Sequence, residues 1–124
     1  MGLKMIKTIK ITVENQILVV ELPDWSYKEK AKAIGAECFE IVRTQRMYDL
    51  FGDSVVMIVD DSGFIENKPM NLVASYFYGA DEHGYPIAGD ILLGVERSPY
   101  NFPLSHPETR KRLLIERFPM LREG

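Results

Sequence analysis

Residues 6–22 carry two runs of hydrophobic positions separated by a short polar break. The first run, IKTIKITV, alternates apolar residues with lysines and threonines, and the second, QILVVEL, is almost continuously apolar. A period of two is typical of a strand with one polar face, and a continuous apolar run is typical of a strand inside a sheet. Glu14 and Asn15 form a polar pair suited to a tight turn. The pattern predicts an N-terminal β-hairpin.

Three further apolar runs predict strands, and three segments predict helices. The strands are CFEIVRT, SVVMIVDD and GDILLGVER, with QRMYDLFG as the connection between the first two. The first helix ends at Gly35, the second has Pro69 in its first turn, and the third, over residues 105–118, begins with a capping box at Ser105. The order ββαββαβα predicts one α+β domain over residues 1–124, a single antiparallel or mixed sheet with helices packed on it.

Side chains of the second predicted helix, KPMNLVASYFYG, fall on three faces at about 100° per residue. The face expected to pack on the core contains Met70, Val73, Ala74 and Phe77. The third face, Leu72 and Tyr76, is apolar and points away from the core. Such a face indicates a second subunit, a ligand or a covering loop such as ADEHGYP. We expect a homo-oligomer.

The second face of this helix is polar and contains Asn71, Ser75 and Tyr78. These residues can bind an adenine-like ring by stacking and amide hydrogen bonds, or they can form a solvated face. Asn71 follows Pro69 in the first turn, so its side chain can instead cap neighbouring backbone groups. Binding is the interpretation that we predict, with Tyr76 beside this face.

Composition narrows the function classes. The net charge of −3 argues against a general nucleic-acid binder. The charge is unevenly distributed, because five acids and no base lie between residues 48 and 67. Cys38 is the single cysteine, and its apolar setting predicts a buried structural thiol in a reducing cytoplasm. No apolar run is long enough for a signal peptide or a membrane span, so a cytoplasmic location is predicted.

The stretch DDSGFIENKPMNLVASYFYG, followed by IAGDILLGV, resembles the signature of a family of small proteins of unknown function. Bacteriophages, plasmids and integrative elements encode this family. The resemblance covers about residues 8–95 and depends most on the Pro-x-Asn motif at Pro69 to Asn71 and on Gly89-Asp90. Leu72 stands where the family usually has an arginine. The resemblance implies an accessory protein of a mobile element, and proteins of this kind include counter-defence factors that sequester nucleotide-derived signals.

No catalytic, metal or cofactor motif stands out. The two histidines, His83 and His106, lack Cys, His or acidic partners at metal-ligand spacing, and no phosphate-binding glycine loop is present. Two pairs of arginines stand out, Arg43 and Arg46 at a strand exit and Arg110 and Arg117 on the last helix. Each pair can clamp a phosphate by forked hydrogen bonds, and the alternative interpretation is that these arginines are solvent-exposed charges.

Two functions remain open. The first is a non-catalytic protein that binds a nucleotide-derived small molecule, through the polar helix face and these arginines. The alternative is an interaction module that inhibits a host protein through its acidic segment, residues 48–67.

Overall fold

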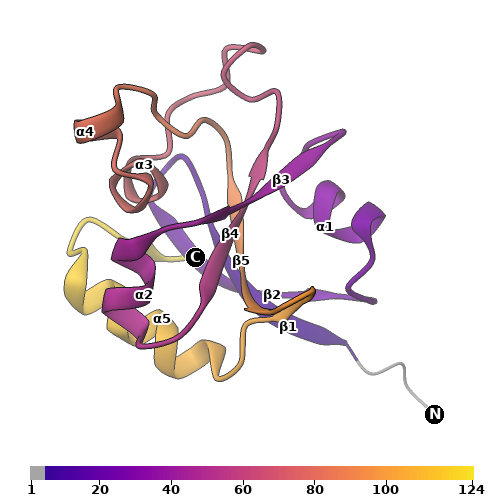
Figure 1. Ribbon diagram of the computed structural model, residues 1–124. Coiled ribbons are helices and arrows are strands. Elements are labelled where there is room, and N and C mark those ends of the chain that lie inside the picture. The colour runs from indigo at the N-terminus through magenta and orange to yellow at the C-terminus, as the bar shows by residue number, and fades with distance from the viewer. Residues whose placement is uncertain (1–4) are drawn as a thin grey trace.

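A single mixed sheet of seven strands, with five helices packed on it, makes up the part of the chain that the computed structural model describes, residues 5–124 (Figure 1). This architecture confirms the predicted α+β class. The strands are β1 Ile6–Ile11, β2 Gln16–Leu22, β3 Phe39–Arg43, β4 Val55–Asp60, β5 Ile91–Arg97, β6 Tyr100–Pro103 and β7 Arg122–Glu123. The helices are α1 Tyr27–Ala33, α2 Gln45–Phe51, α3 Leu72–Tyr78, α4 Ala80–His83 and α5 Pro107–Arg117.

The strands run in the order β3-β4-β5-β1-β2-β7, and β6 joins the sheet beside β5. All neighbours are antiparallel except β2 and β7. β5 is long enough to serve two partners along one edge, because its first residues pair with β1 and residues 94–97 pair with β6. The predicted hairpin of β1 and β2 is present, with Asn15 at a φ of 61° in the turn.

Helices cover the two faces of the sheet unequally. In Figure 1, α2, α3 and α5 lie together on one side and α1 lies on the other. The larger hydrophobic core lies under the three helices and includes Met47 from α2, Phe77 from α3 and Leu114 from α5. A smaller cluster of Leu22, Ile34, Ile58 and Leu92 lies under α1. The larger side therefore carries most of the helix surface available for a site.

The connection QRMYDLFG is a helix, α2, which corrects the predicted order of elements. Thr44 caps it, because the Thr44 hydroxyl accepts from Met47 N at 3.1 Å, and Gly52 ends it with a φ of 64°. Met47 is completely buried, and Leu50 and Phe51 pack beside it on the larger core, so three side chains fix this short helix on the sheet. β6, β7 and α4 were likewise not predicted. The predicted capping box at Ser105 does not form, because α5 begins at Pro107 and its N-cap is His106.

Two burial predictions are wrong. Cys38 is exposed at the position before β3, where its carbonyl oxygen accepts from Asp61 N. Met70 is 48% exposed, because it precedes α3 and forms an isolated bridge with Ala88 instead of facing the core. Val73, Ala74 and Phe77 are buried, as predicted for the core face of this helix.

Candidate functional site

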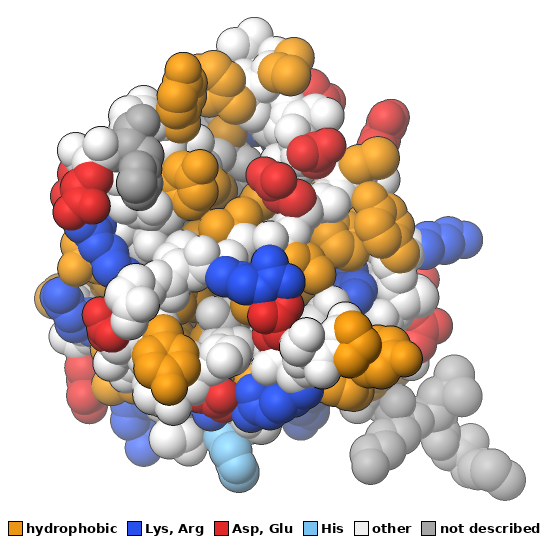
Figure 2. All heavy atoms as spheres, in the orientation of Figure 1, with side chains coloured by type: hydrophobic (Ala, Val, Ile, Leu, Met, Phe, Trp, Pro, Cys, Tyr) orange, Lys and Arg blue, Asp and Glu red, His pale blue; other side chains and the backbone are white. Residues whose placement is uncertain are grey.

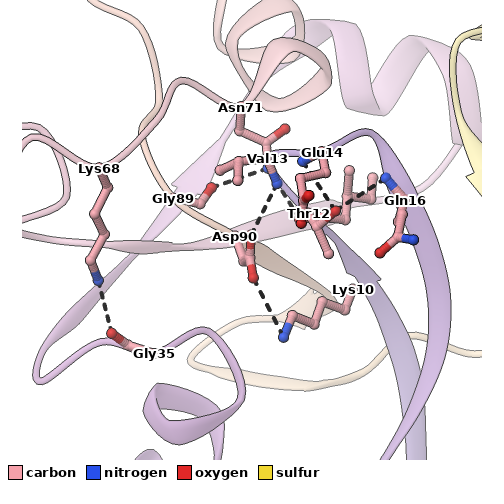
Figure 3. A network of polar contacts seen from close by, with 11 residues as sticks. Lys10, Thr12, Val13, Glu14, Gln16, Gly35, Lys68, Asn71, Gly89 and Asp90 are labelled. Carbon is pink, nitrogen blue, oxygen red and sulfur yellow. Dashed lines mark hydrogen bonds and ion pairs between the residues drawn. The ribbon is translucent and has the colours of Figure 1, made fainter. Parts of the chain in front are cut away.

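Asn71 is the N-cap of α3, and its side chain is completely buried. Its Oδ1 accepts from Ala74 N at 3.1 Å, and its Nδ2 donates to the carbonyl oxygens of Ile11 at 3.0 Å and Gly89 at 3.1 Å. Figure 3 shows the amide of Asn71 directed at Gly89 and the end of β1. The oxygen and both amide hydrogens are therefore used within the chain, and capping, not ligand binding, is the role that this geometry supports.

Ser75 is also buried and bonds the same part of the chain. Its Oγ accepts from Ile87 N at 2.9 Å and lies 3.3 Å from Ile87 O. Nearby, Gly89 N donates to Pro69 O at 2.9 Å, and Asp90 Oδ1 accepts from Val13 N at 3.0 Å. The Pro-x-Asn and Gly-Asp motifs thus form one structural unit that fastens α3 to β5 and β1 (Figure 3).

Tyr78, the third predicted residue of the polar face, is half-buried and packs against the larger core. The helix ends immediately after it, at Gly79 with a φ of 84°. The predicted ligand face of Asn71, Ser75 and Tyr78 therefore does not form, since two of its members are buried and bonded internally. Tyr78 remains accessible from two cavities that lie on either side of it.

Tyr76 is a predicted site residue that contacts two of the predicted arginines. The residue is 39% exposed, and the guanidinium carbons of Arg46 and Arg117 lie 4.5 Å and 5.7 Å from the centroid of its ring. Arg46 Nη1 also donates to the Tyr76 carbonyl oxygen at 2.6 Å, and Arg117 Nη2 donates to the Tyr76 hydroxyl at 3.2 Å. Residues from α2, α3 and α5 meet here, and we call this group the arginine–tyrosine cluster.

Two cavities adjoin the arginine–tyrosine cluster, and Arg46 lines both. The first, about 390 Å³, lies between the start of α2 and the end of α3 and is also lined by Arg43, Thr44 and Gln45. The second, about 330 Å³, lies between α2 and α5 and is also lined by Tyr76 and Arg117. Both volumes lie in the range of small-molecule sites, near its lower end.

Acidic partners already neutralise the two arginines of the first cavity. Arg46 pairs with Asp81 at 2.9 Å and with Glu82 at 3.4 Å, and the hydrogen bond to Asp81 raises the pKa of the Arg46 guanidinium. Arg43 makes a bidentate pair with Glu96, which raises the pKa of Arg43 and lowers that of Glu96. Figure 2 shows the same pattern across this face, where Lys and Arg side chains lie beside Asp and Glu instead of gathering in one patch.

Arg110 and Arg117 do not form the predicted pair. Arg110 bonds Asp53 at 3.3 Å and lies over Phe51, while Arg117 belongs to the arginine–tyrosine cluster. Hydrogen bonds from Arg97, from Ser54 N and from Arg110 lower the pKa of Asp53 to about 2. Arg110 is therefore held in a structural ion network, and Arg117 is the member of the pair that lines a cavity.

Asp81 and Glu82 are the residues of this site that sequence reasoning missed. They lie on α4, a single turn of helix between Gly79 and Gly84, in a segment whose sequence is typical of a loop. The two glycines, both with a φ of 84°, were a signal that the intervening residues fold back in a defined way. Their charge complements Arg46, which lies thirty-five positions from Asp81 in sequence.

The acidic segment 48–67 is divided by internal pairs. Asp53 is bonded by Arg97 and Arg110, and the buried carboxylate of Asp60 is bonded by Lys68. Lys68 also donates to the carbonyl oxygen of Gly35 at 2.8 Å, and its pKa is raised by the hydrogen bond to Asp60. Two of the five acids are thus compensated inside the fold, which weakens the case for a continuous acidic belt.

Among the described residues, no group of three His, Cys, Asp or Glu side chains is arranged to hold a metal ion. Within residues 5–124 no helix combines the length and the apolar character that a membrane crossing requires. Comparisons with protein-family models, with curated proteins and with solved structures give no match.

Proposed function

We propose that this protein binds an anionic, nucleotide-like small molecule in the two cavities beside Arg46 and acts by sequestering it. The observation that carries the proposal is the arginine–tyrosine cluster, in which Arg46 and Arg117 lie against a partly exposed Tyr76 ring at the junction of the two cavities. The resemblance to accessory proteins of mobile elements supports a role in counter-defence, where a nucleotide-derived signal is the expected ligand.

The cluster suits a ligand that combines negative charge with a flat ring. Guanidinium groups bind phosphate oxygens through forked hydrogen bonds, and their planar surfaces stack on aromatic rings. Arg46 is held in place by its bond to the Tyr76 carbonyl and by its contact with the Tyr76 ring, which reduces the side-chain entropy lost on binding. A phosphate over Arg46 and a nucleobase against Arg117 or Tyr76 together match the two-cavity arrangement.

Asp81 and Glu82 limit which anions can bind to Arg46. Both carboxylates contact Arg46, so an anion must compete with them for the guanidinium. These acidic side chains are well exposed, and such surface pairs are screened by solvent and contribute little net stability. A ligand with two or more negative charges, such as a nucleoside diphosphate or a cyclic dinucleotide, can displace them, whereas a singly charged anion cannot.

Leu72 and Tyr76 also support the proposal that the protein self-associates. Leu72 is 46% exposed, and it lies on the side of α3 that faces away from the core. The loop ADEHGYP does not bury these side chains, so that alternative is not the one the structure adopts. A second copy placed on this surface would close the second cavity, which is lined by Tyr76.

Isothermal titration tests the binding proposal directly. The probes are ADP, ADP-ribose, a cyclic dinucleotide and inorganic phosphate, added to the wild type, Arg46→Ala and Arg112→Ala. Arg112 is an exposed arginine of α5 and lines neither cavity of the cluster, so it controls for lost charge. We expect at least one nucleotide to bind the wild type and the control, and Arg46→Ala to lose that binding. Equal loss in both variants, or no binding of any nucleotide, contradicts the proposal.

A further inference from the structure

A third cavity, of about 200 Å³, lies on the other side of Tyr78 from Arg46. It is bounded by the loop that follows β4 and by the segment that leads into β5. Its lining includes the rings of Phe64, Tyr78 and Tyr85 and the acidic residues Glu40 and Asp61. We call it the aromatic cavity. Hydrophobic side chains are prominent over this loop at the top of Figure 2.

Two aromatic rings form perpendicular walls of the aromatic cavity. The rings of Phe64 and Tyr85 meet edge to face, with centroids 6.4 Å apart and planes at 82°. Phe64 is 60% exposed and Tyr85 is 68% exposed, so a large part of each residue is accessible to a ligand. Tyr78, half-buried, adds a third ring to the lining. Aromatic faces carry partial negative charge and attract cations placed over them.

The charge of the aromatic cavity is negative. Glu40 and Asp61 are exposed acids at its rim, and none of its described lining residues is basic. Asp60 also lines the cavity, but Lys68 neutralises its buried carboxylate, and Lys68 is further fixed by Gly35 O. The two exposed acids therefore supply the net charge that a ligand experiences.

The loop that carries Phe64 is fixed by its own hydrogen bonds. Ser62 N donates to Asp60 Oδ1 at 2.9 Å, Glu66 N to Ser62 O at 2.9 Å and Lys68 N to Gly63 O at 3.0 Å. Gly63 packs so tightly that a Cβ atom there would lie 2.6 Å from Ala88 O. The loop thus rests directly on the segment before β5, and the walls of the cavity are set before any ligand arrives.

We propose that the aromatic cavity binds an alkylammonium group, either of a free amine or of a lysine side chain. Aromatic faces with adjacent carboxylates recognise organic cations by combined cation–π and Coulomb attraction. The cavity is smaller than typical nucleotide sites and differs in charge from the cavities beside Arg46, so it suits a single cationic group. This binding site is separate from the proposed anion site and does not depend on it.

Titrations followed by ¹H–¹⁵N NMR test this inference. The probes are choline, its neutral isostere 3,3-dimethylbutan-1-ol, spermidine and a lysine-containing tripeptide. We expect choline to shift the amides of Phe64, Tyr85 and Asp61 saturably, and the neutral isostere to leave them unchanged. Spermidine and the tripeptide distinguish the two sources, since stronger binding of one assigns the cavity to free amines or to protein lysines.

Variants then connect the shifts to the cavity. Phe64→Ala and Tyr85→Ala should each weaken choline binding about two- to fivefold, and Asp61→Asn should act in the same direction. Tyr100→Ala is the matched control, because Tyr100 is as exposed as Tyr85 but lies on β6 and does not line the cavity. Melting curves check that each variant is folded. Equal binding of the neutral isostere, or undiminished choline binding in the folded Phe64 and Tyr85 variants, would overturn the proposal.

Discussion

The side-chain amide of Asn71 donates to the carbonyl oxygen of Ile11 at 3.0 Å and so joins residues sixty positions apart in sequence. Ile11 is the last residue of β1, and Asn71 immediately precedes α3. The bond therefore fixes the start of the helix to an inner strand of the sheet. Since α3 carries Tyr76, this buried contact also determines where the arginine–tyrosine cluster lies.

Asn71→Ala should lower the free energy of unfolding by about 2–4 kcal/mol. The change removes an N-cap, which contributes about 0.5–2 kcal/mol, and leaves the buried carbonyls of Ile11 and Gly89 without this donor. Urea denaturation measures the effect. Lys28→Ala, at an exposed position of α1, is the control and should change stability by less than about 0.5 kcal/mol. A near-neutral Asn71→Ala would show that the amide does not contribute as described.

Asp53 should make stability depend on pH below 4. Its pKa is lowered from 3.8 to about 2, chiefly by Arg97, so the folded state holds the ionised form more strongly than the unfolded chain does. The stabilisation is complete above pH 3.8 and is lost as pH falls through about 2. At about 1.4 kcal/mol per pKa unit the upper limit is about 2.5 kcal/mol at neutral pH, and solvent screening of this partly exposed carboxylate reduces the contribution to about 1 kcal/mol.

The test of this pH dependence compares the wild type with Asp53→Asn by urea denaturation between pH 2 and pH 6. The variant should be less stable than the wild type at pH 6, and the two should converge toward pH 2. Arg97→Gln should reproduce part of the loss, because Arg97 makes the strongest of the bonds that lower the pKa. A constant difference across the whole range would exclude Asp53 as its source.

Cys38 should react rapidly with a thiol reagent in the native protein, because its side chain is exposed. Cys38→Ser should change the free energy of unfolding by less than about 0.5 kcal/mol, as expected at an exposed position. Labelling with Ellman's reagent, with and without denaturant, gives the two rates to compare. Protection of the thiol until the protein unfolds would contradict the exposed position.

The elements predicted correctly are those whose signals are local. The hairpin of residues 6–22 follows from alternation within each strand, and the core face of α3 follows from the spacing of Val73, Ala74 and Phe77. The helix α2 was missed because it is only seven residues long, although Met47, Leu50 and Phe51 follow the i, i+3, i+4 spacing and pack on the larger core. β7 is only two residues long, and its partner β2 is distant in sequence. β6 follows β5 after two residues, and it was missed because it is short and contains Pro103, a residue type that is depleted in strands.

Some residues of the candidate site were predicted correctly from the sequence and others were not, because a local pattern does not show contacts with distant parts of the chain. Arg46, Arg117 and Tyr76 were identified by chemical type, and they meet. Asn71 and Ser75 were identified by helical periodicity, but their burial depends on Gly89 and Ile87, which approach α3 from another part of the chain. A periodicity shows which residues share a face and does not show what covers that face.

Removing the acids of α4 should strengthen anion binding at Arg46. In Asp81→Asn/Glu82→Gln both competing carboxylates become neutral amides, so the guanidinium attracts a phosphate without first giving up an ion pair. Because exposed ion pairs are weak, the rise in ADP affinity should be modest, about two- to fivefold. The matched control is Glu108→Gln/Glu116→Gln on α5, which removes the same net charge at exposed positions away from Arg46. Titration at two salt concentrations separates local competition from overall charge, since only a long-range effect disappears at high salt. An equal gain in the control double variant would attribute the change to net charge and would remove α4 from the account of this site.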